Sequence, residues 1–320
     1  MACCRKDILP VIISGRFYTF AGNLNMFLGY NYIDVLVNVV LALIMLGIGL
    51  SLTVRDFKNL FVRPKPLVIA LAVQLFLIPL IAFIIAAFSN ISPEAKVGMV
   101  VVTLCASGAS SNLITHLFKG NVALAISMTT INSFITLLSI PLMANLALLL
   151  FLGVEREIHL SVVKTVVQIF IVALIPAGIG VFIRRKKENI AIGLEKPLKI
   201  ILPLLLGFVF TIKIFFGKAT GGTGITVSET TTLMLPLMLL NFLAMSAGFF
   251  VARLFKLKFQ DQFTISIEVG LHNTALALLI TGTILKSPEM EKPAVVYAMF
   301  SFFTAIIFVL IVKKFFSNKP

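Results

Sequence analysis

The residue types best suited to bind a cation inside a membrane lie in one short segment, Glu268–Asn273. This segment interrupts an apolar run from about Phe263 to Leu285, which is long enough to cross a bilayer at ~1.5 Å per residue. An acid at mid-membrane depth costs about 2.5–3.5 kcal/mol on insertion scales, so it normally faces a bundle interior and marks an ion or substrate path. Gly270 lets the backbone leave helical geometry and turn its carbonyls toward a ligand. The segment therefore predicts a cation site in a broken helix.

An alternative is that Glu268 pairs with a lysine or arginine only to hold the helices together. No basic residue lies within the segment, and this alternative leaves Gly270 without a role. We therefore favour the cation site.

The composition places this segment in a membrane protein. Of the 320 residues, 59% are hydrophobic and only 12% are charged, and the mean hydropathy is +1.07. A soluble domain is nearer 45–50% apolar and about 25% charged. The net charge of +14 would indicate nucleic acid in a soluble protein, but here the basic residues follow membrane topology. We expect a lipid bilayer as partner, and no nucleic acid.

Nine apolar runs are long enough to cross a bilayer, which predicts an all-α polytopic membrane protein with about nine transmembrane helices. The runs lie near residues 33–54, 67–88, 95–117, 121–150, 159–183, 198–216, 231–255, 262–285 and 293–315. Residues 1–31 make a poor span because Pro10, Arg16 and Asn23 interrupt them, and we read them as an interfacial lead-in.

The basic residues predict how the chain is oriented. Of the 27 Lys and Arg residues, 17 fall on the side of the first loop and 10 on the other side. The richer side is expected to be cytoplasmic. The sequence therefore predicts a multi-pass protein of the cell (inner or plasma) membrane, with the N terminus outside and the C terminus in the cytoplasm.

A second interruption is predicted in the third apolar run. Cys105–Asn112 is a run of small and hydroxyl residues in which a helix could open, although such residues also suit a helix-packing face. Gly108–Asn112 and Gly270–Asn273 interrupt spans at corresponding positions of two halves, which is typical of an inverted-repeat transporter with a midplane site. We expect the repeats to cover residues 32–158 and 159–320.

Two neighbouring spans carry polar residues that could reach the interruptions. Ala125, Thr129 and Asn132 share a helix face, so Thr129 could offer its hydroxyl to the opened third helix. Gln74 lies among apolar residues of the second run. It forms either a helix–helix hydrogen bond or part of the ion site.

Three motifs together resemble the bile acid sodium symporter family. They are Met45–Leu52, Ser110–Asn112 followed by Gly120–Leu124, and Glu268–Asn273, and the resemblance extends from about residue 33 to the end. It implies two broken helices that cross in a core domain, which moves against a panel domain in alternating access. The core would contain runs two, three, four, seven, eight and nine, and the panel runs one, five and six. The first helix of the bacterial members would be missing.

The resemblance also implies Na+ at two sites beside the crossing. It assigns the first ion to Ser111, Asn112, Thr129 and Glu268. It assigns the second ion to Gln74, Glu268, Val269, Leu271 and His272, with Val269 and Leu271 acting through backbone oxygens. No other metal is implied.

The chain departs from the family pattern beside both ions. Ala125 stands where the family commonly has a serine, which removes one possible ligand from the first site. His272 stands where the family has a glutamine, and an imidazole can carry charge near pH ~6–7 and then repel sodium. The second site therefore either binds sodium weakly or takes up a proton through His272 and Glu268. A plain helix-packing role for His272 is the third alternative.

The residues expected to meet substrate are Asn112 and Asn273, whose amides could bind a carboxylate. By the resemblance, Ala109 replaces a threonine, and Thr304 is the polar residue left where some bacterial members present a histidine and an asparagine. The motifs therefore indicate the family more specifically than they indicate the substrate.

These observations favour sodium-coupled symport of a small organic anion, such as a bile acid, a 2-oxo acid or a pantoate-like compound. The alternative is proton-coupled transport by the same fold through Glu268 and His272. An intramembrane enzyme is disfavoured because the sequence has no HExxH motif and no nucleophile paired with a base. A membrane receptor that binds without transport stays open, to be distinguished by flux.

Overall fold

The structure is a computed structural model that describes residues 32–51, 64–153, 162–215, 217 and 222–316. The described residues form helices and connecting turns, and none forms a strand. The expected lead-in, residues 1–31, lies outside the described residues. In the first half the elements are α2 (Tyr32–Ser51), α4 (Pro64–Ala72), the π-helical turn η1 (Val73–Leu77), α5 (Ile78–Phe88), α6 (Pro93–Leu104), α7 (Ala109–Leu117) and α8 (Val122–Leu152).

The second half follows the same all-helical plan. Its elements are α9 (Val162–Ile169), η2 (Phe170–Leu174), α10 (Ile175–Lys186), α11 (Glu188–Phe215), α12 (Val227–Leu254), α13 (Phe259–Gly270), α14 (Thr274–Leu278), η4 (Leu279–Ile284) and α15 (Pro288–Phe316). The all-α prediction is confirmed for the described residues.

Within the described residues, five helical segments are long and apolar enough to cross a membrane, and a bent pair could form a sixth. The five are Pro64–Phe88, Val163–Lys186, Val227–Leu254, Phe259–Ile284 and Pro288–Phe316. Val35–Leu50 and Ile200–Phe215 are apolar but shorter. The chain is thus a multi-pass helical membrane protein, and each of the nine predicted runs overlaps one or more of its helices.

The bent pair lies within α8, where Val122–Thr136 and Leu138–Leu152 meet at 60°. Pro141 explains the bend, because its nitrogen has no proton to donate to the carbonyl four residues earlier and its ring clashes with that carbonyl. The first half of α8 contacts α13, where Thr129 bonds Glu268, and the second half lies beside α6, where Lys96 sits over the ring of Phe151.

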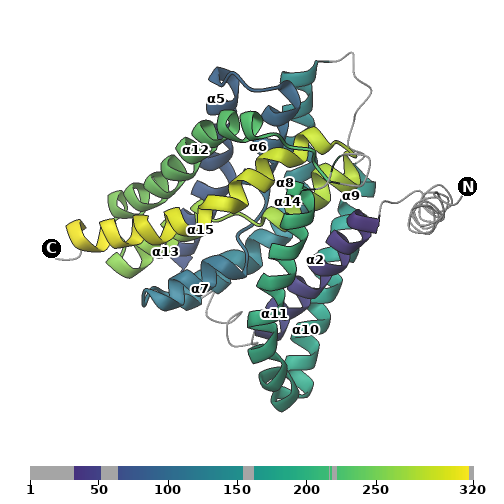
Figure 1. The fold of residues 1–320 in the computed structure, drawn as a ribbon. Helices are drawn as coiled ribbons and strands as arrows, with labels where there is room; N and C mark the ends of the chain where they lie inside the picture. The colour runs from purple at the N-terminus through teal and green to yellow at the C-terminus, as the bar shows by residue number, and fades with distance from the viewer. Residues whose placement is uncertain (1–31, 52–63, 154–161, 216, 218–221, 317–320) are drawn as a thin grey trace, which may run out of the picture.

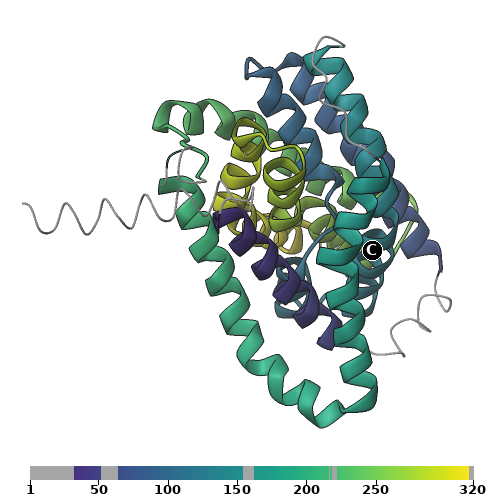
Figure 2. The ribbon, with the colours of Figure 1, turned by 90° about the vertical axis from the view of Figure 1, so that its right-hand side faces the viewer.

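The helices α10 and α11 are joined at one end and diverge, and α2 packs between them, as Figure 2 shows. Elsewhere, α12 packs against both α13 and α15, and α6 packs against α8 and α15 (Figure 1). The segment from Asp261 to Thr281 is buried at every residue. A helix buried on all sides belongs at the centre of a bundle, which explains how this span tolerates polar residues.

Glycines allow α2 and α10 to approach closely. A Cβ on Gly180 would meet the carbonyl oxygen of Leu46, and a Cβ on Gly49 would meet that of Ala177. We expect Gly180→Ala to lower the unfolding temperature of the purified protein, with a cost of about 1–3 kcal/mol from overpacking.

Gly178 provides the matched control because it lies two residues away in α10 and a Cβ there would meet no atom within 4 Å. Gly178→Ala should leave the unfolding temperature unchanged or raise it slightly, since alanine favours a helix by up to ~1 kcal/mol over glycine. Equal effects of the two substitutions would contradict the close approach.

Candidate functional site

The first interruption separates α6 from α7. Cys105 is extended, with φ −77° and ψ 120°, and Gly108 at the start of α7 has φ −118° and ψ −166°. The break therefore covers residues 105–108, earlier than the expected Gly108–Asn112. Ser110 and Asn112 instead lie in the first turn of α7, because the Ser111 amide already donates to the Gly108 carbonyl at 3.2 Å.

The second interruption separates α13 from α14 and touches the first. Leu271 and Asn273 both have non-helical backbone angles. In a continuous helix the Asn273 amide would donate to the Val269 carbonyl. Here it donates to the Ala106 carbonyl at 3.0 Å, so backbone groups of the two interruptions bond to each other and the Val269 oxygen loses its helical partner.

Glu268 lies one turn before this contact and is 1% exposed. Its Oε2 accepts hydrogen bonds from the hydroxyls of Ser107 and of Thr129, the latter at 3.1 Å, and these two hydroxyl oxygens are 3.1 Å apart. Its Oε1 is buried and accepts no hydrogen bond within the described residues. Three elements therefore converge on one carboxylate: the first interruption, α8 and α13.

The carboxylate has no basic partner in the part of the chain that the structure describes. The ion pairs found there join other residues, such as Lys213 to Glu291 at 2.9 Å and Lys292 to Glu229 at 2.6 Å. The alternative in which Glu268 only pairs with a lysine or arginine is therefore not supported. A buried acid without a basic partner normally needs a cation or a proton.

The α7 residues of the first expected ion site lie beside this carboxylate or the break. The Ser111 hydroxyl donates to the Gly108 carbonyl at 2.7 Å and lies near Glu268. The Oδ1 oxygen of Asn112 is buried and has no hydrogen-bond partner within the described residues. Ala109 is the first residue of α7.

Gln74 belongs to the second expected ion site and contacts the end of α6. Its amide Nε2 donates to the Thr103 carbonyl at 3.1 Å, while its Oε1 is buried without a hydrogen-bond partner among the described residues. Both interpretations of Gln74 are therefore compatible with the structure. Its Nε2 forms the helix–helix hydrogen bond, and its Oε1 remains available as an ion ligand.

The remaining members of the second site are buried in the second interruption. Val269 is 0% exposed, and Leu271 and His272 are also buried. Neither ring nitrogen of His272 makes a hydrogen bond of ordinary geometry within the described residues, although the Cys105 backbone lies near it. The His272 ring packs beside that of Tyr297, with centroids 5.5 Å apart.

Two of the expected substrate residues are engaged in structural contacts. The Asn273 side chain accepts a hydrogen bond from the Leu276 amide at 3.0 Å and so caps α14. The half-buried Thr304 donates to the Oδ1 of Asn241 at 2.6 Å. That Asn241 amide in turn donates to the Gly270 carbonyl at 2.8 Å and to the hydroxyl of Tyr297 at 2.9 Å.

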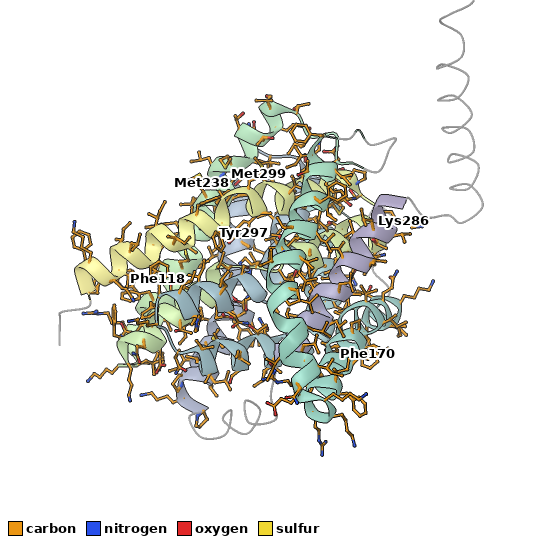
Figure 3. The ribbon with its side chains drawn as sticks, turned by 60° about the horizontal axis from the view of Figure 1, so that its bottom comes forward. Phe118, Phe170, Met238, Lys286, Tyr297 and Met299 are labelled. Carbon is orange, nitrogen blue, oxygen red and sulfur yellow. The ribbon has the colours of Figure 1, made fainter. Side chains whose placement is uncertain are left out.

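Sequence reasoning did not single out Ser107, Asn241 or Tyr297 as site residues. Asn241 could have been found by the signal that pointed to Gln74, an amide in the middle of an apolar span. Ser107 lies within the small-residue run, but nothing in the local sequence indicates that its side chain contacts Glu268, which is 161 positions away. Tyr297, labelled in Figure 3, is fully buried and carries no distinctive sequence signal.

Gln74 and Asn241 occupy matching positions in the two halves. Each donates to a carbonyl 29 residues further along the chain, that of Thr103 or of Gly270. Asn241 lies 167 positions after Gln74, and Gly270 lies 167 positions after Thr103. The same difference separates Asn273 from Ala106, whose backbone groups bond to each other where the two interruptions touch.

The arrangement offers oxygen atoms that suit a small hard cation. Hard cations take carboxylate, hydroxyl, amide and carbonyl oxygens as ligands. Leaving a buried acceptor unpaired costs about 1–3 kcal/mol, and within the described residues Gln74, Asn112 and Glu268 each have one such acceptor. A cation bound among these oxygens would offset that cost.

Comparison with known proteins agrees with the geometry. Residues 38–223 match the family model described as the Sodium Bile acid symporter family. A sodium-dependent transporter of Bacillus subtilis is 28% identical over 272 residues, which are 84% of this chain and 80% of that protein. A probable sodium/metabolite cotransporter of Arabidopsis thaliana chloroplasts is 27% identical over 259 residues, 80% of this chain but only 61% of that protein.

The hepatic sodium/bile acid cotransporter of Rattus norvegicus is 26% identical over 294 residues, 90% of this chain and 79% of that protein. A match of that length leaves about a tenth of the chain outside, so it includes the Glu268 segment as well as the first interruption. The family match covers more than half of the 320 residues. This chain therefore belongs to the Sodium Bile acid symporter family.

Proposed function

We propose that this protein is a secondary active transporter that couples inward movement of sodium to uptake of a small organic anion. It belongs to a family of transporters and is not an enzyme. The observation that carries the proposal is the buried Glu268 carboxylate, which has no basic partner among the described residues and lies at the contact between two interrupted helices. Interrupted helices at such a contact are typical of transporters with a midplane ion site.

Two sodium ions are proposed at this contact. The first would bind to Glu268, Thr129, Ser111 and Asn112, with Ser107 as a further hydroxyl beside the carboxylate. The second would bind to Gln74, Glu268, His272 and the backbone oxygens of Val269 and Leu271. The unpaired oxygens of Gln74 and Glu268 support this assignment, as does the Val269 carbonyl that lost its helical partner.

An inverted repeat of residues 32–158 and 159–320 is the proposed architecture. The matched contacts that differ by 167 positions support it, and so does the order of the helices. Moved by 167 positions, α6 (Pro93–Leu104) coincides with α13 within one residue. The proposed chain crosses the membrane nine times and has its N terminus outside. The helices α2, α10 and α11 would belong to the panel domain.

The proposed cargo is a carboxylate-bearing compound of the bile acid or metabolite class named for the relatives. Asn112 is the best candidate contact, because its amide Nδ2 can donate to a carboxylate and its helix α7 directs its N-terminal end at the break. Asn273, Ala109 and Thr304 would border the same region.

Uptake by proteoliposomes tests the proposal. Candidate bile acids, 2-oxo acids and pantoate-like compounds are first screened by thermal unfolding with and without sodium, because a bound ligand stabilises the folded state. Radiolabelled uptake of each hit is then measured under an inward sodium gradient and under an inward proton gradient without sodium. Uptake that follows only the sodium gradient is expected. Uptake that ignores sodium would overturn the proposal, and uptake that follows the proton gradient would establish the proton-coupled alternative.

His272 offers a prediction that separates the two couplings. Under sodium coupling, His272→Gln should lower the sodium concentration for half-maximal uptake, because glutamine adds an amide oxygen, which a hard cation prefers to the ring nitrogens of histidine. Under proton coupling, the same substitution should make uptake dependent on sodium. The measurement is a sodium titration of uptake by both proteins. If His272 serves only in packing, the substitution will leave the sodium dependence unchanged.

A further inference from the structure

A buried hydrogen-bond network lies at the end of α13, outside the proposed sodium ligands. Asn241 of α12 donates to the Gly270 carbonyl at 2.8 Å, and the Tyr297 hydroxyl of α15 donates to the same carbonyl at 2.7 Å. Asn241 also donates to the Tyr297 oxygen at 2.9 Å and accepts from Thr304 at 2.6 Å. Asn241 and Tyr297 are no more than 1% exposed.

The network distinguishes Asn241 from its counterpart in the first half, Gln74. Both amides donate to the carbonyl of a helix end, that of Thr103 or of Gly270. Gln74 keeps a buried, unpaired oxygen that can bind a cation. Asn241 donates both amide protons and accepts on its oxygen within the network, so each of its polar atoms already has a protein partner. The two amides therefore have different tasks.

The task of Asn241 follows from where the Gly270 carbonyl lies. The residues on either side, Val269 and Leu271, supply the backbone oxygens proposed for the second ion. The peptide group is planar, so two donors on one carbonyl set the direction of the whole Gly270–Leu271 peptide plane. The peptide planes on either side share the Cα atoms of Gly270 and Leu271 with this plane. The directions of the Val269 and Leu271 carbonyls are therefore restricted as well. Without the network this helix end would be free to choose other carbonyl directions, because it lacks helical donors.

We propose that Asn241 and Tyr297 are positioning residues for sodium, which hold the α13 carbonyl end in the direction that the ion requires. This inference rests on the proposed function. Partners that orient metal ligands from outside the coordination shell typically change affinity 10–100-fold when mutated. Asn241→Leu and Tyr297→Phe should therefore raise the half-saturating sodium concentration at least about tenfold, while the maximal rate at saturating sodium is largely kept.

Two readouts test the inference. The first is the rise in unfolding temperature of the purified protein as sodium replaces choline at constant ionic strength, which reports sodium affinity without transport. The second is a sodium titration of uptake that separates half-saturation from maximal rate. Tyr297→Phe is the gentler variant because it removes a single oxygen. Thr211→Val is the control, since its hydroxyl bonds the Gly207 carbonyl within α11 and lies in an exposed position.

The outcomes are distinguishable. Variants that need about tenfold more sodium in both readouts, beside an unchanged Thr211→Val, support the inference. Variants that lose stability without sodium but keep the parental sodium affinity assign the network a purely structural role and overturn it. If Asn241→Leu fails to fold, Tyr297→Phe decides between these results. A parental protein that gains no stability from sodium and takes up no anion with it would overturn the proposed function itself, and the inference with it.

Discussion

Glu268→Gln is expected to abolish sodium-driven uptake, with a loss of at least about 100-fold in transport rate at a fixed sodium concentration. The substitution keeps the size of the side chain and an acceptor for Thr129 but removes the negative charge. Two unit charges ~4 Å apart interact by about 4 kcal/mol at an effective dielectric constant near 20. Losing most of that attraction accounts for a loss of two or more orders of magnitude.

The same substitution should act on stability with the opposite sign when sodium is absent. A buried carboxylate without a cation is costly, so the neutral amide is expected to raise the unfolding temperature in choline buffer. In sodium buffer the parental protein should regain stability through ion binding, and the variant should not. The measurement is the unfolding temperature in both buffers, together with uptake.

Glu188→Gln is the matched control for this charge removal. Glu188 lies at the start of α11, where its side chain is 68% exposed and 3.7 Å from Arg184. It should change neither uptake nor the sodium-dependent gain in stability, because exposed ion pairs contribute ~0–1 kcal/mol. Sodium-driven uptake that survives in Glu268→Gln would remove the central role given to this carboxylate.

Lys213→Met is expected to destabilise the protein by about 3–5 kcal/mol, the largest stability effect among the substitutions considered. Lys213 of α11 and Glu291 of α15 lie 2.9 Å apart, and each side chain is 3% exposed. Removing the lysine takes this positive charge away from the buried glutamate, which is the costly way to break such a pair. Thermal unfolding of the purified variant measures the loss.

The double variant Lys213→Met/Glu291→Met separates charge from packing. Replacing both buried charges by apolar side chains of similar size is often neutral, so the double variant should recover most of the stability lost in Lys213→Met. Glu188→Gln serves again as the exposed comparison and should cost less than ~1 kcal/mol. A double variant as unstable as the single one would show that the pair matters through its shape or other contacts instead of its charges.

Much of the candidate site was predictable from local sequence. Glu268 and Gly270 stand out because polar and flexible residues are rare in an apolar span, and the small-residue run around Ser107 stands out for the same reason. The position of the first interruption was less predictable. Several residues of that run permit a helix to open, and the break lies at residues 105–108 where backbone bonds to the second interruption form.

Other features depend on contacts that no local pattern contains. Lys213 is one of the ten basic residues that the sequence assigns to the outer side, and only the structure shows that its side chain is buried against Glu291, 78 positions away. Thr304 was expected to meet substrate, and it donates to Asn241 from a neighbouring helix. The role of Lys213 and of Thr304 therefore depends on a partner from another helix, which the local sequence does not identify.

The sequence by itself determined that this chain is a helical membrane protein with a carboxylate in a broken span, and its motifs indicated the family. Hydrophobic runs and helix-breaking residues act over a few turns, so they can be read locally. Only the tertiary structure decided which oxygens surround Glu268 and which side chains hold the end of α13. Those contacts join residues between 27 and 161 positions apart, and they form only when separate helices pack against one another.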